Sequence, residues 1–380
     1  HDRRATECVH AKRGINADLR DRVTTTPTPR DRPTHGATQL LNQSAAQAMT
    51  DRNKFKRLMI MLGLTLACAL ITPWLGHHLT SPNVILRPMA DDVDAIIFWQ
   101  IRLPRVLLSL LAGAGLSLGG VVFQALFRNP LATPFTLGVA SGASLGVTLA
   151  IVTGIHFSLL GLSGTSLAAL SGAIISIVLV YGIARATGKT SPSTMLLGGV
   201  AISFFFSSLI LLLQYLSDPG SSFRVLHWLM GDLSRASIDS VLQLAPFVIS
   251  GIIIVSTLHR ELNLLSITDD IAASRGVNVQ RTQMLLFFAV SLMVAGIITV
   301  CGPIGFVGIM APHICRLLIG PNHRFLIPAS ILFGASFLAL CDTLARNISS
   351  TAEVPVGIVT AILGGPFFLW LLLSKNRLAS

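Results

Sequence analysis

The chain consists of long apolar runs separated by short polar segments. One run begins after Arg105 and continues without a charged residue to Phe127; at about twenty residues it is long enough for a helix to cross a bilayer. A polar break occupies residues 128–130, and a second apolar run begins near Thr133. The pattern therefore predicts two successive transmembrane helices in this region.

The same pattern recurs along the rest of the chain and predicts about ten spans. Besides the two runs above, the expected limits are Leu58–Trp74, Leu162–Ala184, Thr194–Leu216, Val241–Leu258, two spans within Met284–Leu318, Phe325–Leu344 and Gly357–Leu373. Gly302-Pro303 and Pro312 are expected to interrupt the pair within residues 284–318. The polar segment at residues 217–239 is expected to hold a short interfacial helix. We therefore expect an all-α, polytopic membrane protein whose ten-helix domain covers residues 56–375.

Composition and charge agree with a membrane protein. Hydrophobic residues make up 52% of the chain and charged residues 12%, whereas a soluble domain has about 25% charged residues. The formal net charge of +11 could indicate a nucleic-acid-binding protein. However, the basic residues lie in the N-terminal tail and in short loops, as the positive-inside rule predicts. Their distribution favours cytoplasmic N- and C-termini and contact with membrane lipid, not with nucleic acid.

The N-terminal region differs from the rest of the chain. Residues 1–55 are polar, rich in Arg, Asp, Thr and Pro, and have no apolar period. Such a composition predicts a disordered cytoplasmic tail. Because Met49 and the basic residues after it would make a natural start, we interpret residues 1–48 as an artefact of an upstream start.

Small residues recur in the apolar runs, often at G-x-x-x-G spacing, which lets neighbouring membrane helices approach closely. Other small or rigid residues stand where runs end or break. The residues expected to shape helix packing and helix ends are Gly115, Gly119, Asn129, Pro130, Gly138, Gly142, Pro303 and Pro312.

Signals of catalysis or ion coupling are weak. Residues 182–190 resemble a phosphate-binding loop, but five residues separate the two glycines where the motif needs four. We therefore predict no catalytic residue, no cofactor and no metal site, and any ATP hydrolysis would need a partner. A secondary transporter would need acidic residues within its spans. The expected spans contain none except Asp342, which lies near one end of the ninth. An intramembrane enzyme would need a paired nucleophile and base, or a set of metal ligands, within its spans. His313 alone supplies neither.

The polar segment after the sixth span is the best candidate for contact with such a partner. Its two aspartates suit the first turn of a helix, where the helix dipole favours anions, and its glycine can end that helix. Its alanines would give the helix a small face that fits a shallow cleft, the alternative being a solvated loop with one helical turn. The residues concerned are Asp269, Asp270, Ala272, Ala273, Arg275 and Gly276.

Several motifs are similar to those of a known family. They are R-x-P-R at residues 102–105, A-G-A-x-L-x-L-x-G at 112–120, Q-A-L-F-R-N-P-L-A-x-P at 124–134 and G-P-I-G-F-x-G-x-x-x-P-H at 302–313. Together they resemble the membrane permease subunit of bacterial ATP-binding-cassette (ABC) importers for iron–siderophore complexes, haem and cobalamin. The resemblance implies a type II ABC importer permease fold in the bacterial inner membrane. It also implies separate ATPase subunits, a periplasmic substrate-binding protein and a second permease subunit, in a homodimer or a heterodimer.

The resemblance assigns roles to particular residues. The segment at residues 269–276 matches the coupling helix that contacts the ATPase, although relatives often have Leu where this chain has Arg275. Three arginines match those that meet glutamates of the binding protein, although arginines at span ends also snorkel to lipid head groups; they are Arg102, Arg105 and Arg346. Hydroxyl side chains of the fifth span are expected to line the pathway, namely Ser203, Ser207 and Ser208.

The expected function is transport of an iron(III)–siderophore complex across the inner membrane by alternating access. Haem and cobalamin are alternative substrates within the same family. A secondary transporter driven by an ion gradient is the alternative from a different class.

Overall fold

The structure is a computed structural model of the 380-residue chain, and it describes residues 34–76, 92–154, 158–159, 162–186, 192–348 and 353–377. The chain divides into two units, His1–Lys54 and Phe55–Ser380. Helix α2, Thr34–Ile71, contains the point of division. The first 33 residues of the tail that we predicted to be disordered lie outside the described residues. From Thr34 onward the structure has helix where disorder was predicted, because residues 39–49 are mostly Gln, Leu, Ala and Met, which favour helix.

The second unit is built almost entirely from helices. After α2 the helices are η1 (Thr72–Trp74), α3 (Val93–Ile96), the π-helix η3 (Ile97–Arg102), α4 (Leu103–Leu126), η4 (Pro134–Leu137), α5 (Val139–Val152), α6 (Gly164–Ala186), α7 (Pro192–Leu216), α8 (Pro219–Leu229), α9 (Ile238–Thr257), α10 (His259–Leu265), α11 (Asp269–Ser274), α12 (Val279–Cys301), α13 (Val307–Ile319), α14 (His323–Asn347) and α15 (Val356–Arg377). Two short antiparallel strands, β1 (Ser158–Leu159) and β2 (Leu162–Ser163), come just before α6 in the sequence and pair with each other.

Seven helical segments among the described residues are long and apolar enough to cross a membrane. The third, eighth and tenth predicted spans correspond to shorter apolar helices, at Val139–Val152, Val307–Ile319 and Val356–Trp370. The short helix expected between the fifth and sixth spans is α8. The Asp218 carboxylate caps α8 by accepting a hydrogen bond from the Ser221 amide at 2.9 Å, and hydrogen bonds with the Ser221 side chain and backbone lower the pKa of Asp218.

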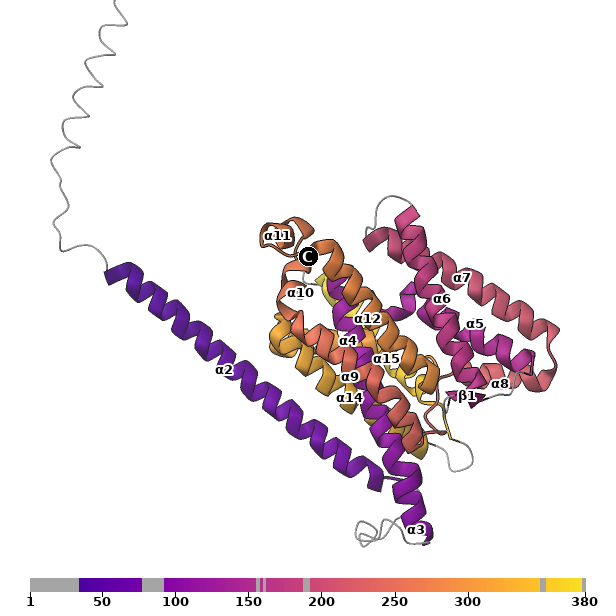
Figure 1. Cartoon of the computed structure of the whole chain (residues 1–380). Coiled ribbons are helices and arrows are strands. Elements are labelled where there is room, and N and C mark those ends of the chain that lie inside the picture. Colours follow the sequence, from indigo (N-terminus) through magenta and orange to yellow (C-terminus); the bar gives the residue numbers. More distant parts are fainter. Residues whose placement is uncertain are drawn as a thin grey trace, which may run out of the picture. The chain divides into compact units, whose positions relative to one another are not determined.

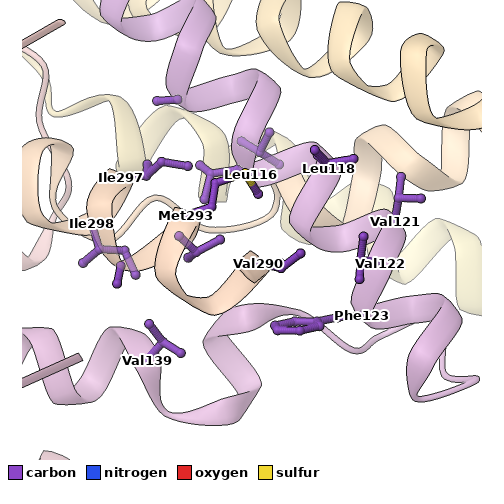
Figure 2. Close-up of a cluster of buried hydrophobic side chains, with 14 of the residues drawn as sticks. Leu116, Leu118, Val121, Val122, Phe123, Val139, Val290, Met293, Ile297 and Ile298 are labelled. Atoms are coloured by element: carbon purple, nitrogen blue, oxygen red, sulfur yellow. The ribbon is translucent and has the colours of Figure 1, made fainter. Parts of the chain in front are cut away.

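Helix α4 lies at the centre of the second unit. It contacts α9, α12, α13 and α14, while α5, α6 and α7 contact one another in a second group beside it (Figure 1). Helix α12 contacts members of both groups. In Figure 2, Leu116 of α4 meets Met293 and Ile297 of α12, and each of these side chains is at most 2% exposed. The apolar faces of α4 and α12 therefore form much of the core.

Our prediction of a break between the seventh and eighth spans is confirmed at one proline and wrong at the other. Helix α12 ends at Cys301 and α13 begins at Val307, so the chain is interrupted at Gly302-Pro303. Pro312, however, lies inside α13. Because proline has no N–H, the carbonyl of Gly308 loses its helical donor, and the Gln124 side chain of α4 donates to that carbonyl instead at 3.1 Å. The amide oxygen of Gln124 in turn accepts from Arg316, so α13 continues past the proline.

The hydrogen bond between the Gln124 side chain and the Gly308 carbonyl requires α4 and α13 to lie very close together. Gly120 lies one turn before Gln124 on α4. A Cβ atom at Gly120 would overlap the carbonyl oxygen of Gly308. Gly182 in α6 provides a contrast, because a Cβ there would meet nothing within 4 Å.

We expect Gly120→Ala to lower the melting temperature of the detergent-purified protein, because overpacking of this kind costs about 1–3 kcal/mol. Gly182→Ala is the matched control and should keep or raise the melting temperature, since alanine favours helix by about 1 kcal/mol over glycine. Equal melting temperatures for the two variants would contradict a backbone contact between α4 and α13.

Candidate functional site

Two polar clusters lie at opposite ends of α4. The first, which we call the arginine cluster, consists of Arg102, Arg105 and Arg346 with the carboxylates of Asp342 and Glu353. The second, which we call the Asp269 cluster, joins Arg128 to the segment that contains α11. Helix α4 has 24 residues and is therefore about 36 Å long, which separates the two clusters by roughly the thickness of a bilayer.

The arginine cluster brings together the three arginines singled out in the sequence. Arg105, in the first turn of α4, donates from Nε to both carboxylate oxygens of Asp342, at 2.9 and 3.1 Å. Its Nη1 donates to Glu353 at 2.5 Å. Arg346 lies one turn after Asp342 on α14, with its Nε 3.3 Å from the same carboxylate. Arg102 donates to the carbonyl of Pro73 at 3.3 Å.

These arginines do not extend into solvent. Arg102, Arg105 and Arg346 are 6%, 2% and 9% exposed, so they neither snorkel outward nor form a simple charged surface. Asp342 is fully buried between two of them. A buried charge is costly unless it is paired, and the close packing of α14 on α4 supplies that pairing. The sequence contained one signal of this pairing: Asp342 is the single acidic residue of an apolar helix and stands four residues before Arg346.

We expect Asp342→Ala to destabilise the protein by about 3–5 kcal/mol, because it leaves buried guanidinium groups without their counter-charge. The measurement is thermal unfolding of the purified chain in detergent. Asp239→Ala is a suitable control: Asp239 is exposed in the first turn of α9, and its loss should cost only about 0.3–1 kcal/mol. Similar unfolding of the two variants would show that the buried pair does not stabilise the fold.

The Asp269 cluster surrounds the predicted coupling segment. The expected short helix is present as α11; Thr268 caps it by accepting from the Ile271 amide at 3.2 Å, and Gly276 follows it with φ of +82°. Within the segment, the side chain of Ala272 is buried, whereas Asp270, Ala273, Arg275 and Gly276 are exposed. One face of α11 therefore packs on the bundle and the other is exposed.

Arg128 holds this segment to the end of α4, a contact that sequence reasoning missed. The residue has φ of +47°, which is unusual for a residue with a side chain. Its guanidinium pairs with the Asp269 carboxylate, and its Nε donates to the carbonyl of Leu265 at 3.0 Å. Gln283 of α12 donates to the same carboxylate at 3.1 Å. In the sequence Arg128 stood out only as a basic residue of a short loop.

We expect Asp269→Asn to loosen α11 and Asp270→Asn to leave it unchanged. Both substitutions remove one charge from the same helical turn, but only Asp269 is bound by Arg128 and Gln283. Hydrogen exchange at residues 269–276 should become about two- to fivefold faster in Asp269→Asn, the range expected for a partly exposed pair. Equal exchange in the two variants would contradict a positioning role for Arg128.

The serines proposed to line a pathway do not form one group. Ser203 of α7 faces α5, with its hydroxyl 3.4 Å from that of Ser141, and it donates to the carbonyl of Gly199 at 2.8 Å. Ser207 and Ser208 are exposed, and Ser208 donates to the carbonyl of Phe204 at 2.9 Å. In this single chain, the exposed serines lie on a helix with many exposed apolar side chains.

The residues expected to shape packing lie at close helix contacts and turns. A Cβ at Gly115 would lie 2.6 Å from Ile297 and one at Gly119 would lie 3.2 Å from Val294. A Cβ at Gly142 would overlap the carbonyl of Gly172 in α6.

The turns have their own contacts. Gly138 has φ of +80° just before α5. In the loop after α4, the side chain of Asn129, next to Pro130, accepts from the Leu131 amide at 3.0 Å. Pro303 follows the end of α12, where its carbonyl lies against Gly231. Among the described residues, no three His, Cys, Asp or Glu side chains gather closely enough to hold a metal ion.

Comparison with known proteins identifies the family. A match to the model of the FecCD transport family extends over residues 64–374, which is most of the chain. The chain belongs to this family. As a FecCD protein it is the permease of an ABC importer, a multi-pass membrane protein with a transport role.

Individual relatives of this FecCD protein have different named substrates. The hemin transport system permease HmuU of Yersinia pestis is 36% identical over 84% of this chain and 97% of its own length. The iron(3+)-hydroxamate import system permease FhuG of Bacillus subtilis is 35% identical over 74% of this chain and 85% of its own. A solved structure, described as a candidate metal-chelate ABC transporter facing inward, has a TM-score of 0.76 at 35% identity and covers 84% of this chain and 99% of its own. The family is therefore clear, while the substrate differs among relatives of nearly equal similarity.

Proposed function

We propose that this FecCD permease moves an iron(III)–siderophore complex inward across the inner membrane by alternating access. The observation that carries the proposal is the match of residues 64–374 to the FecCD family. Similarity to a permease named for iron(3+)-hydroxamate and to a transporter of the metal-chelate type supports an iron chelate as the substrate.

The proposal includes partners that supply energy and substrate. Two permease subunits, identical or related, would form a pathway between them, with the exposed serines of α7 on its wall. Two ATPase subunits would bind ATP on the cytoplasmic side, where both termini and the tail at residues 1–55 would lie. A periplasmic protein would deliver the chelate. The names of the relatives support this assembly, because they describe permeases of import systems and not complete transporters.

The two ends of α4 suggest where these partners dock. The exposed face of α11, with Asp270 and Ala273, is suited to the ATPase, because a short helix with small side chains fits a shallow cleft. At the opposite end, the arginine cluster is suited to carboxylates of the binding protein. Movement of α11 on ATP binding would then reach α4 through Arg128.

Haem is the second candidate substrate, because HmuU is similar to this chain over a larger share of both proteins. Cobalamin, which the sequence motifs also allow, is a third. Each candidate is a bulky chelate, so the same mechanism would serve all three.

The test is substrate-dependent ATP hydrolysis in proteoliposomes that contain the chain with its ATPase subunits and one binding protein. We expect stimulation when the binding protein carries a ferric siderophore, and little stimulation with haem or cobalamin. Stimulation of ATP hydrolysis by haem or cobalamin, and not by a ferric siderophore, would support the importer function but contradict the proposed substrate.

A separate arm of this experiment tests the class of transporter. Uptake would be measured in vesicles without ATP but with an imposed proton or sodium gradient. We expect no uptake under these conditions. Uptake that follows the gradient and needs no ATPase subunit would refute the proposed mechanism.

A further inference from the structure

Arg105 is bound by two carboxylates that differ in their surroundings. Asp342 accepts two hydrogen bonds from Nε, and its side chain is 1% exposed. Glu353 accepts one hydrogen bond from Nη1, and its side chain is 52% exposed. Glu353 lies three residues before α15, so the second carboxylate stands at the surface while the first belongs to the core.

The two carboxylates therefore differ in how easily they can leave. If the Asp342 carboxylate separated from Arg105, neither group would reach water, and both buried charges would be left unpaired. Release of Glu353 would move an already half-exposed carboxylate fully into water, which costs little because water competes for exposed ion pairs. Among the contacts of Arg105, the bond to Glu353 is thus the one that another anion can replace.

A vacant hydrogen-bonding position on Arg105 favours such a replacement. Its Nη2 is buried and has no hydrogen-bond partner among the described residues. A carboxylate that approaches the end of a guanidinium can accept from both terminal nitrogens in the fork geometry. Glu353 uses only Nη1, so an incoming carboxylate with better geometry can make one more hydrogen bond than Glu353 makes.

The local charge balance points to the same kind of partner. Arg105 and Arg346 are balanced by two anionic side chains, Asp342 and Glu353, and Arg102 lies near the carboxylate of Asp94. Displacement of Glu353 leaves an excess of positive charge around Arg105. An acidic protein surface, with a carboxylate that projects from it, is the complementary partner.

We propose that Glu353 is an internal competitor that occupies Arg105 until a carboxylate of the docking protein replaces it. The inference rests on the proposed docking role of the arginine cluster. It adds a regulatory step: the docking surface is closed by its own carboxylate in the free permease and opens only to a partner that binds Arg105 better. It also explains how Arg105, which is buried in the free chain, can still serve in docking.

A purely structural role for Glu353 makes the opposite prediction. If the pair only holds the segment before α15 in place, removal of the charge loosens the docking surface and weakens binding. If Glu353 competes with the partner, removal of its charge strengthens binding. The sign of the change in affinity therefore separates the two roles, and general damage to the protein does not strengthen binding.

The experiment measures the affinity of the purified binding protein for the permease–ATPase complex in nanodiscs. Glu353→Gln keeps the size of the side chain and removes its charge. We expect a two- to tenfold lower Kd, with most of the change in the association rate, and a smaller difference between variant and wild type at high salt. The control is Asp92→Asn, which removes a charge from an exposed residue that makes no side-chain capping bond before α3, and it should leave Kd within twofold of wild type.

The outcomes separate the inference from the proposed function. A wild-type complex that binds the protein, with Glu353→Gln equal or weaker in affinity, overturns the competitor role alone. An equal gain in affinity for Asp92→Asn also overturns it, because the effect would then be one of net charge. A wild-type complex that assembles with its ATPase but binds no docking protein overturns the proposed docking role, and the competitor role with it.

Discussion

The ion pair between Arg105 and Asp342 is the constraint on which much of the structure depends. Both groups are buried, and neither could stay charged in the core without the other. Their bond fixes the start of α4 against the end of α14, two helices that are far apart in the sequence. Below this bond the two helices remain in contact, since a Cβ at Gly113 would overlap the carbonyl of Gly334. Charge pairing at one end and small residues in the middle thus hold α4 in a single position.

The centre of the bundle depends on a similar compensation between helices. Pro312 removes one hydrogen bond from α13, and the side chain of Gln124 replaces it from α4. The replacement is possible only because Gly120 allows the two backbones to meet. A proline that would break an isolated helix therefore becomes a point of attachment between helices. Helix α4 is thus bound at both ends and in its middle, which suits an element that would connect the two proposed docking surfaces.

The sequence predicted the elements better than their contacts. Apolar runs and polar breaks located the long spans, because span length follows from bilayer thickness and needs no knowledge of neighbours. The short helix α11 was also predictable, because the aspartates of its first turn and its terminal Gly276 are local signals. The helix through Pro312 was not predictable, because its compensation comes from Gln124, which is 184 positions before the Gly308 carbonyl that it binds. The partners of Arg105 are 237 and 248 positions away, so the sequence suggested a surface arginine where the structure has a buried one.

The proposed pathway can be judged by the chemistry of α7. This helix contains no charged residue, and hard Fe³⁺ would need anionic oxygen ligands to be taken from its chelator. The hydroxyl protons of Ser203 and Ser208 are already used by carbonyls of the same helix. Such a wall offers a passing complex weak contacts and no competing ligands, so an iron chelate would cross intact. Under the proposed function, one chelate would then be selected over another before the pathway, at the protein that delivers it, which agrees with the different substrates named for relatives of nearly equal similarity.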